Sequence, residues 1–240
     1  MIAGTARQSE NEPGPTLVAV AGVVLEAFAD GGLWWADRRL LVVADLHFEK
    51  GSSFARRGQM LPPYDTAETL ARLSRLMARL DPAAVIALGD SFHDDGGAAR
   101  LLPRDRAALA TLQSGREWIW IAGNHDREMP ADLAGMHADT LAIGPLVFRH
   151  EPATGEDAAG EIAGHLHPGA RVIRRGRSIR RPCFATDGKR LVMPAFGAFT
   201  GTLNVLDKAW RGILHREDLT AYLMGPGRLY PIPGSSLAAG

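Results

Sequence analysis

Five apolar, strand-like runs in this chain each end in an acidic, amide or histidine side chain, and no other feature constrains the fold as strongly. The first run, residues 40–44, is followed by Asp45-Leu46-His47. The later runs end in these side chains: Asp90, Asn124, His150, and the pair His165 and His167. Each run carries an oxygen or imidazole group to its C-terminal edge, which is typical of a site built on strand ends.

Helices are predicted between the runs in the first half of the chain. Asp65 and Glu68 have the spacing of a capping box, and an apolar stripe follows them as far as Asp81-Pro82. A second helix is predicted with Pro103 in its first turn and Gly115 past its end. Strand, helix, strand, helix, strand is the pattern of a βαβ half with a largely parallel sheet.

From residue 140 the chain contains short strands separated by Gly and Pro turns, which indicates antiparallel or mixed sheet. Candidate ligands come from both halves, and no low-complexity linker separates them. We therefore predict an α/β fold with a single domain over residues 16–233, in which two sheets pack face to face with helices outside. The polar residues 1–15 and the small residues 234–240 are expected to be flexible tails.

The composition is that of an ordinary globular protein, with 46% hydrophobic and 22% charged residues in a chain of 240. The formal net charge is zero, so any nucleic-acid site needs a local basic patch. A single cysteine, Cys183, excludes an intrachain disulfide and is predicted to be a buried thiol. The chain has no signal-peptide pattern and no run that could span a bilayer, so we expect a cytoplasmic protein with no membrane partner.

The side chains at the ends of the runs form a mixed oxygen and imidazole set without thiolates. Such a set suits Mn, Fe, Zn or Ni better than Mg alone. Seven ligands are too many for one ion but enough for two ions that share a carboxylate. Paired ions of this kind hold the attacking and leaving oxygens of a phosphoryl group, and they activate water as a nucleophile. The seven are Asp45, His47, Asp90, Asn124, His150, His165 and His167.

The complete set, in this order and with the spelling Gly123-Asn124-His125-Asp126, resembles the calcineurin-like metallophosphoesterase superfamily. The resemblance implies a four-layer αββα sandwich of two mixed β-sheets flanked by helices. It also implies that a metal-bridging hydroxide attacks phosphorus in line. His125 would protonate the leaving oxygen or stabilise the phosphoryl charge, and Asp126 would fix the His125 ring. The implied ligands are Asp45, His47 and His167 for one ion and Asn124, His150 and His165 for the other, with Asp90 bridging.

The flanking segments 45–58, 61–66 and 194–201 are similar to those of the bacterial ligase-associated DNA damage response endonuclease (PdeM) group. This narrower resemblance implies a Mn-dependent DNA endonuclease of DNA repair, with single-stranded or flexible DNA as substrate. It also implies a functional association with a DNA ligase and a helicase, and a catalytic role for His93. Two alternatives stay open. One is a phosphatase or a phosphodiesterase for cyclic nucleotides or nucleotide diphosphates, and the other is a non-catalytic scaffold in a repair assembly.

Basic residues follow the first and the last metal motifs. Arg56 or Arg57 could clamp a phosphate with the guanidinium fork, or both could lie on a solvated helix face. The later run could bind a polyanion or form a solvated strand face. This run consists of Arg171, Arg174, Arg175, Arg177, Arg180 and Arg181. The four tryptophans of the predicted strands are assigned to the core: Trp34, Trp35, Trp118 and Trp120.

Overall fold

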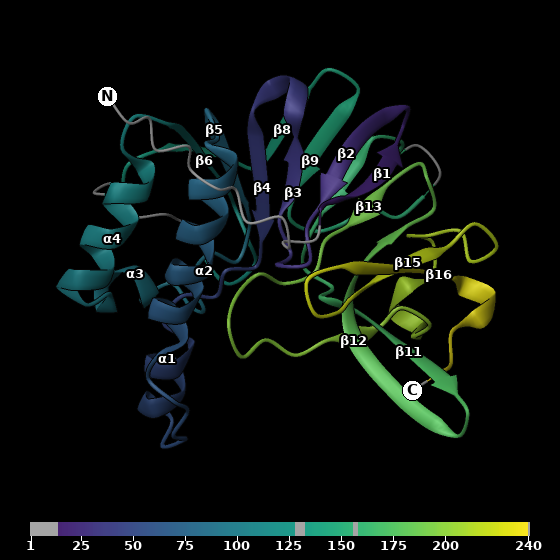
Figure 1. Ribbon diagram of the computed structural model, residues 1–240. Helices are drawn as coiled ribbons and strands as arrows, with labels where there is room; N and C mark the ends of the chain where they lie inside the picture. Colours follow the sequence, from purple (N-terminus) through teal and green to yellow (C-terminus); the bar gives the residue numbers. More distant parts are fainter. Residues whose placement is uncertain (1–13, 128–132, 156–157, 240) are drawn as a thin grey trace, which may run out of the picture.

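The computed structural model describes residues 14–127, 133–155 and 158–239, which form two mixed β-sheets packed against each other (Figure 1). In the first sheet β1 to β4 pair antiparallel, whereas β4 to β7 pair parallel. The predicted parallel arrangement is therefore confirmed for the half that carries the first metal motifs. Its strands, in spatial order, are β1 (Thr16–Val20), β2 (Val23–Ala27), β3 (Leu33–Trp35), β4 (Leu40–Ala44), β5 (Ala84–Leu88), β6 (Glu117–Ile121) and β7 (Met136–Ala138).

The second sheet is built entirely from the second half of the chain and mixes parallel with antiparallel pairs, as predicted. β9, β10 and β13 run parallel, and β11 and β12 form a long antiparallel hairpin. Its main path runs through β14 (Leu203–Asn204), β11 (Pro168–Arg174), β12 (Arg177–Thr186), β13 (Leu191–Val192), β10 (Glu161–Ala163), β9 (Leu146–Arg149) and β8 (Thr140–Ile143). Beside it, β12 also pairs with β15 (Thr220–Met224), which pairs with β16 (Leu229–Pro233).

Alternation along the parallel strands divides the apolar side chains between two cores. Val42 and Ile86 face the second sheet, where they belong to one cluster with Phe148. Their neighbours Leu41 and Val85 face the helices. All five residues of β4 are buried because both faces of the sheet are covered. The inter-sheet core joins both halves of the chain, which is the arrangement expected if residues 16–233 form one domain.

Two helices cover the outer face of the first sheet, α2 (Asp65–Leu80) and α4 (Pro103–Gln113), at the bounds that the sequence predicts. Shorter helices, α1 (Lys50–Arg56) and α3 (Gly97–Arg100), lie beside them. The predicted capping box at Asp65 is wrong. Tyr64 is the N-cap and makes no side-chain cap, and Asp65 is the first residue of the helix. The buried Asp65 carboxylate instead accepts the Gly51 N–H at 3.0 Å and so joins α1 to α2.

The outer face of the second sheet is covered by residues 203–219. This segment contains a short 3-10 turn, η2 (Lys208–Trp210), and packs Val205, Trp210 and Ile213 against the sheet. The predicted fold of two mixed sheets with helices is confirmed. The fourth layer, on the outer face of the second sheet, consists mostly of turns in place of long helices. Further 3-10 turns are η1 (Ala36–Arg38) and η3 (Gly234–Ser236).

The two predicted tails fall partly outside the described residues, which exclude 1–13 and Gly240. The C-terminal end of the described chain is hydrogen-bonded to the second sheet. The Ala238 N–H donates to the Arg171 carbonyl at 2.8 Å, and Asn204 Nδ2 donates to the Ala238 carbonyl at 3.1 Å. Flexibility of these ends stays a prediction. Among the described helices, none has the length and apolar character needed to cross a membrane.

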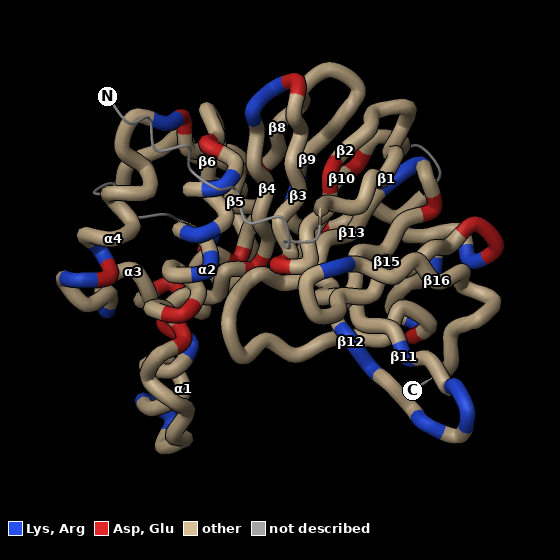
Figure 2. The backbone as a smooth tube through the Cα atoms, viewed as in Figure 1, with Lys and Arg blue, Asp and Glu red and all other residues tan. Residues whose placement is uncertain are grey.

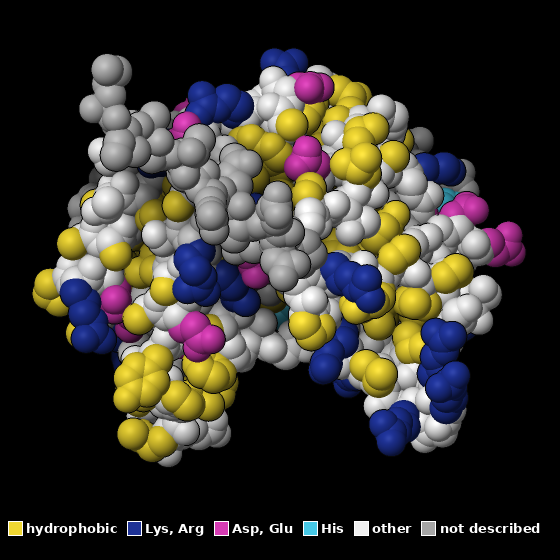
Figure 3. Space-filling model, in the orientation of Figure 1, with side chains coloured by type: hydrophobic (Ala, Val, Ile, Leu, Met, Phe, Trp, Pro, Cys, Tyr) yellow, Lys and Arg dark blue, Asp and Glu magenta, His cyan; other side chains and the backbone are white. Residues whose placement is uncertain are grey.

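Two projections extend from the same side of the sandwich (Figure 1). One consists of α1 and the loop that follows it, and the other is the β11–β12 hairpin. Lys and Arg residues mark the hairpin in Figure 2, and Figure 3 shows a hollow in the surface between the two projections. The strand ends that carry the metal motifs lie above this hollow.

Candidate metal centre

The backbone brings the predicted ligands together from two sheets. Asp45 follows β4, Asp90 follows β5 across one glycine, and Asn124 lies just beyond β6, so the three parallel strands deliver them to one edge. From the second sheet, His150 directly follows β9 and His165 lies just beyond β10, which is parallel to β9. His167 precedes β11 and completes the set.

Many of these residues have an unusual backbone conformation. The φ angle is 52° at Asp45, 45° at His47, 45° at Asp90, 68° at His165 and 44° at His167. A non-glycine residue in this left-handed region costs about 1–3 kcal/mol and persists only where its surroundings enforce it. The surroundings here include the His47 N–H donating to the Asp90 carbonyl at 2.9 Å. Such clustered strain is characteristic of functional sites.

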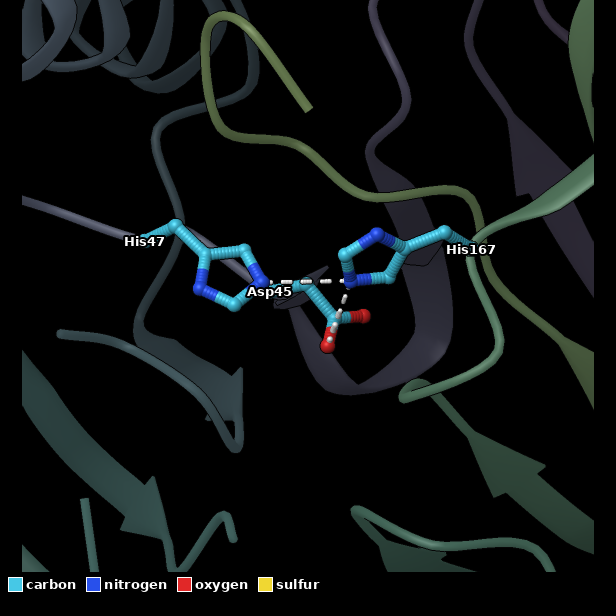
Figure 4. Close-up of side chains that lie close together, drawn as sticks. All are labelled: Asp45, His47 and His167. Carbon is cyan, nitrogen blue, oxygen red and sulfur yellow. Dashed lines mark hydrogen bonds and ion pairs between the residues drawn. The ribbon is translucent and has the colours of Figure 1, made fainter. Parts of the chain in front are cut away.

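The first group of side chains consists of Asp45, His47 and His167, which point toward one another in Figure 4. His47 Nε2 lies 3.2 Å from His167 Nε2, which lies 3.3 Å from Asp45 Oδ1. The backbone N–H of His165 donates to both Asp45 carboxylate oxygens at 3.1 Å and fixes their orientation. Burial, and then the charge of His167, lowers the pKa of His47 to about 2, so His47 has the neutral ring that binds metals.

The second group consists of Asp90, His150 and His165, with Asn124 beside them. His150 Nε2 lies 3.3 Å from Asp90 Oδ1, 3.0 Å from Asn124 Oδ1 and 3.2 Å from His165 Nδ1. Burial opposes protonation of His150, yet the Asp90 carboxylate raises its pKa to about 9. The negative charge of the Asp90 carboxylate, which favours a proton on His150, also favours a divalent cation beside it for the same electrostatic reason.

Asp90 lies between the two groups. Its Oδ1 contacts His150 at 3.3 Å, and its Oδ2 lies 4.0 Å from His47 Nε2. The His125 N–H donates to Oδ1 at 2.9 Å, which leaves the carboxylate facing both groups. Asp90 therefore lies within reach of both groups, and its bridging role stays a prediction.

The chemistry of the set fits two metal ions. Asp45 and Asp90 are fully buried, and in the described part of the chain neither forms an ion pair with a lysine or arginine. Among the described residues, the two buried carboxylates have only histidine rings as charge partners, chiefly His150, whose pKa the Asp90 carboxylate raises, so the site still favours additional cations. Ring nitrogens that face each other at 3.2 Å, as those of His47 and His167 do, also repel unless a cation or a proton lies between them. Divalent cations at both groups remove both costs.

Glycines before the ligands allow the backbones to approach this closely. A Cβ on Gly123 would lie 2.2 Å from the Asp90 backbone nitrogen, and a Cβ on Gly89 would lie 2.3 Å from the His150 ring. Gly89 also has a φ of 72°, which disfavours any other residue. The glycine in each of these motifs therefore has a steric function.

His125 lies beside the metal groups but is turned toward solvent, with 41% of its side chain exposed and Nε2 at 4.0 Å from Asp90 Oδ2. Its ring is oriented by the His93 carbonyl oxygen, 2.9 Å from Nδ1. The resemblance assigned this task to Asp126, and that part of the prediction is wrong. The Asp126 carboxylate accepts the Phe92 N–H at 2.9 Å instead, and burial raises its pKa to about 7.

The His93 ring stacks on the His125 ring, with centroids 5.3 Å apart and 20° between the planes. Its centroid is 5.4 Å from that of His47, so His93 borders the first metal group. Burial, and then the charge of Lys50, lowers the pKa of His93 to about 4, which keeps the ring neutral near pH 7. The structure therefore brings His93 into the site.

The predicted arginines lie on the two projections and outside the ligand cluster. Arg56 and Arg57 are exposed at the end of α1, and the charge of Arg57 contributes to the lowered pKa of His93. On the hairpin, Arg171 pairs with Arg180, and Arg174 pairs with Arg177 across the ladder. Arg174 and Arg175 are exposed, whereas Arg171 is half-buried and donates from Nε to Ser178 at 2.8 Å.

Sequence reasoning missed the residues that support the first metal loop. The Glu49 N–H donates to Thr66 Oγ1 at 2.8 Å, and the Thr66 hydroxyl donates to Glu49 Oε1 at 3.1 Å. Both side chains are buried, and Glu49 has a φ of 64°. This exchange fastens the loop after His47 to α2. No local pattern signals it, because the partners are 17 residues apart.

Comparison with known proteins decides the family. The model of the calcineurin-like phosphoesterase family matches residues 38–173, more than half of the chain. The chain belongs to this family. It is a metallophosphoesterase, a hydrolase of phosphate esters, and the predicted resemblance to the superfamily is confirmed. The roles of the individual ligands stay predictions, although the two groups coincide with the implied sets apart from Asn124 and the shared Asp90.

A solved nuclease structure shares the fold over nearly the whole chain. The nuclease MPE of Pseudomonas putida is 32% identical, with a TM-score of 0.69 over 91% of this chain and 100% of that chain. Yfce, a phosphoesterase from E. coli, is 14% identical, with a TM-score of 0.41 over 81% of this chain and 98% of that chain. No curated protein sequence matches.

Proposed function

We propose that this metallophosphoesterase is a dinuclear phosphodiesterase that cleaves DNA. The observation that carries the proposal is the convergence of two ligand groups on Asp90, at the edge of a surface hollow flanked by a basic hairpin. The similarity to a nuclease over the full length of that protein supports a nucleic-acid substrate. Asp45, His47 and His167 would hold one cation, and Asn124, His150 and His165 the other.

Two divalent cations at these positions supply a water activated for attack and neutralise charge on the phosphoryl oxygens. The chain's own groups then complete the chemistry. His125 is exposed at the site and its Nδ1–H donates to the His93 carbonyl, so in the imidazolium form the ring would give its Nε2 proton to the departing sugar oxygen and become neutral. The stacked His93 ring keeps that orientation and borders the phosphate position.

A polymeric substrate is favoured by the shape and charge around the centre. The hollow between the two projections is open, and histidine side chains are visible where it meets the body of the protein (Figure 3). Arg171, Arg174 and Arg175 lie on the hairpin, and Arg56 and Arg57 lie at the end of α1, so both projections carry cations. In a chain of zero net charge, such paired basic surfaces fit a strand of phosphates that crosses the hollow.

We further propose that Mn²⁺ is the working metal, although the donor set also suits Fe, Zn or Ni. The proposed context is DNA repair in the cytoplasm, with a functional association with a DNA ligase and a helicase. Single-stranded or flexible DNA is the proposed substrate.

The proposal is tested by adding Mn²⁺ to metal-free protein in the presence of circular single-stranded DNA. A circle has no ends, so any linear product requires endonuclease activity. Nicking that needs both Mn²⁺ and Asp90, with Asp90→Ala as the inactive control, is the expected result. If the circle stays intact while small phosphate esters are hydrolysed, the protein is an active phosphoesterase and DNA is rejected as its substrate.

A further inference from the structure

The loop between β13 and β14, residues 194–202, forms a rim beside the metal centre. Its Phe196 N–H donates to the Ala44 carbonyl at 2.8 Å and its Gly197 N–H to the Asp45 carbonyl at 3.0 Å, so the loop lies directly on the end of β4. We refer to residues 194–202 as the rim loop. In Figure 1 the rim loop passes between α1 and the β11–β12 hairpin.

The rim loop is bonded to both projections. Lys50 Nζ, from α1, donates to the Phe199 carbonyl at 2.9 Å, and the Arg180 guanidinium, from β12, donates to the Thr202 carbonyl. The loop is therefore fixed at both sides of the hollow, next to a metal ligand.

Phe199 is the side chain that the rim loop exposes. Its exposed fraction is 47%, and its φ is 58°, a strained conformation for a bulky residue. Strain of this kind persists when surrounding contacts enforce it, here the bond from Lys50 to the Phe199 carbonyl, and it clusters at ligand sites. Exposure of one apolar ring is ordinary, but an exposed ring on a strained backbone, in a loop bonded to the Asp45 carbonyl, points to a ligand for the ring.

A second aromatic ring lies beside the same lysine. The Phe54 ring, on α1, is half-buried, and its centroid lies 5.9 Å from Lys50 Nζ. Its centroid also lies 5.4 Å from that of the His93 ring, at an interplanar angle of 37°, and His93 stacks in turn on His125. Ring contacts thus lead from the proposed proton donor His125 through His93 to Phe54. Lys50, beside Phe54, is bonded to the Phe199 backbone carbonyl.

We propose that Phe54 and Phe199 form a stacking platform for unpaired nucleobases on either side of the phosphate at the metal centre. This inference rests on the proposed function as a DNA-cleaving enzyme. Every nucleobase has a flat face that can stack on a phenyl ring, so the platform is tolerant of sequence. In a duplex those faces are covered by neighbouring base pairs. The platform therefore gives a physical basis for selecting single strands over duplex.

The test compares Phe54→Ala and Phe199→Ala with the wild type on three substrates at saturating Mn²⁺. One is a single-stranded oligonucleotide, one is the same strand with abasic sites flanking the cleaved phosphate, and one is a small phosphodiester without nucleobases. Tyr230→Ala, which removes a 39% exposed ring on β16, is the matched control. Phe199→Tyr keeps a ring, and Phe199→Leu keeps apolar bulk without one.

For each alanine variant, we expect KM for the normal strand to rise about 5- to 140-fold, the range that base–aromatic stacking supports. Turnover of the small ester should be unchanged. On the abasic strand the wild type should already have the higher KM, and the variants should add nothing. Phe199→Tyr should behave as the wild type, Phe199→Leu as the alanine variant, and Tyr230→Ala should change nothing.

Three results would overturn the platform. They are an unchanged KM for the normal strand, an equal loss on the abasic strand, and a parallel loss on the small ester. The last result would assign both phenylalanines to support of the metal centre. Failure of the wild type to cleave any DNA would remove the proposed function and the platform together, whereas wild-type cleavage with unaffected variants removes the platform alone.

Discussion

Replacing Gly123 with alanine adds one methyl group where the backbone passes beside Asp90. The new Cβ would lie 2.2 Å from the Asp90 backbone nitrogen and 2.3 Å from its Oδ1, whereas ordinary contacts begin at 3.4 Å. The added group and Asp90 must therefore separate by about 1 Å, and Asp90 is the proposed bridging ligand. Overpacking of this kind costs about 1–3 kcal/mol of stability, and a 1 Å displacement at a reacting centre costs about 100-fold in rate.

The assay measures the free energy of unfolding in denaturant and kcat/KM for a small phosphodiester with added Mn²⁺. Gly201→Ala is the matched control, because a Cβ at Gly201 has no neighbouring atom within 4 Å. We expect Gly123→Ala to lose stability and about 100-fold in kcat/KM, and Gly201→Ala to change neither. Equal behaviour of the two variants in both measurements would refute the close-approach argument.

Three further predictions concern the proton donor, the hairpin and the thiol. His125→Ala should lower turnover by about 10²–10⁴-fold while metal content, measured by elemental analysis, stays at the wild-type level, and loss of metal would contradict its non-ligand role. Combined Arg174→Gln and Arg175→Gln should reduce the slope of log affinity for single-stranded DNA against log salt by about 0.7 for each phosphate that the two arginines neutralise. Fluorescence anisotropy measures that slope, Arg104→Gln on α4 is the control, and an unchanged slope would exclude phosphate binding by this pair. Burial raises the pKa of the Cys183 thiol, so a disulfide reagent should modify it only after unfolding, and fast labelling of native protein would contradict its burial.

The sequence was sufficient to predict the elements that depend on local pattern. The apolar runs before Asp45 and Asp90 are buried parallel strands, and parallel pairing brings those two side chains to one edge. The helix over 65–80 follows from its apolar stripe and from Asp81-Pro82. Recurrence of ligand-type residues at strand ends therefore predicted which residues would meet, although their pairing into two groups came from the resemblance.

Features set by distant contacts could not be predicted. The Asp126 carboxylate was expected to fix the His125 ring. It accepts the backbone N–H of Phe92 instead, 34 residues away in sequence. The capping pattern at Asp65 failed for the same reason, since tertiary contact with Gly51 outweighs the local preference. The backbone carbonyl of Phe199 is bonded to a lysine 149 residues earlier, and no local pattern indicates the left-handed backbone of Phe199.

The central claim, that two ion sites share Asp90, is tested most directly by counting the manganese bound per chain. Metal-free protein is titrated with Mn²⁺ and freed of excess metal, and the bound metal is measured by elemental analysis and by electron paramagnetic resonance. We predict two ions per wild-type chain with the signal of a coupled pair, one ion for His167→Ala, and none held tightly by Asp90→Ala. A single uncoupled ion in the wild type, or two ions retained by Asp90→Ala, would contradict the account.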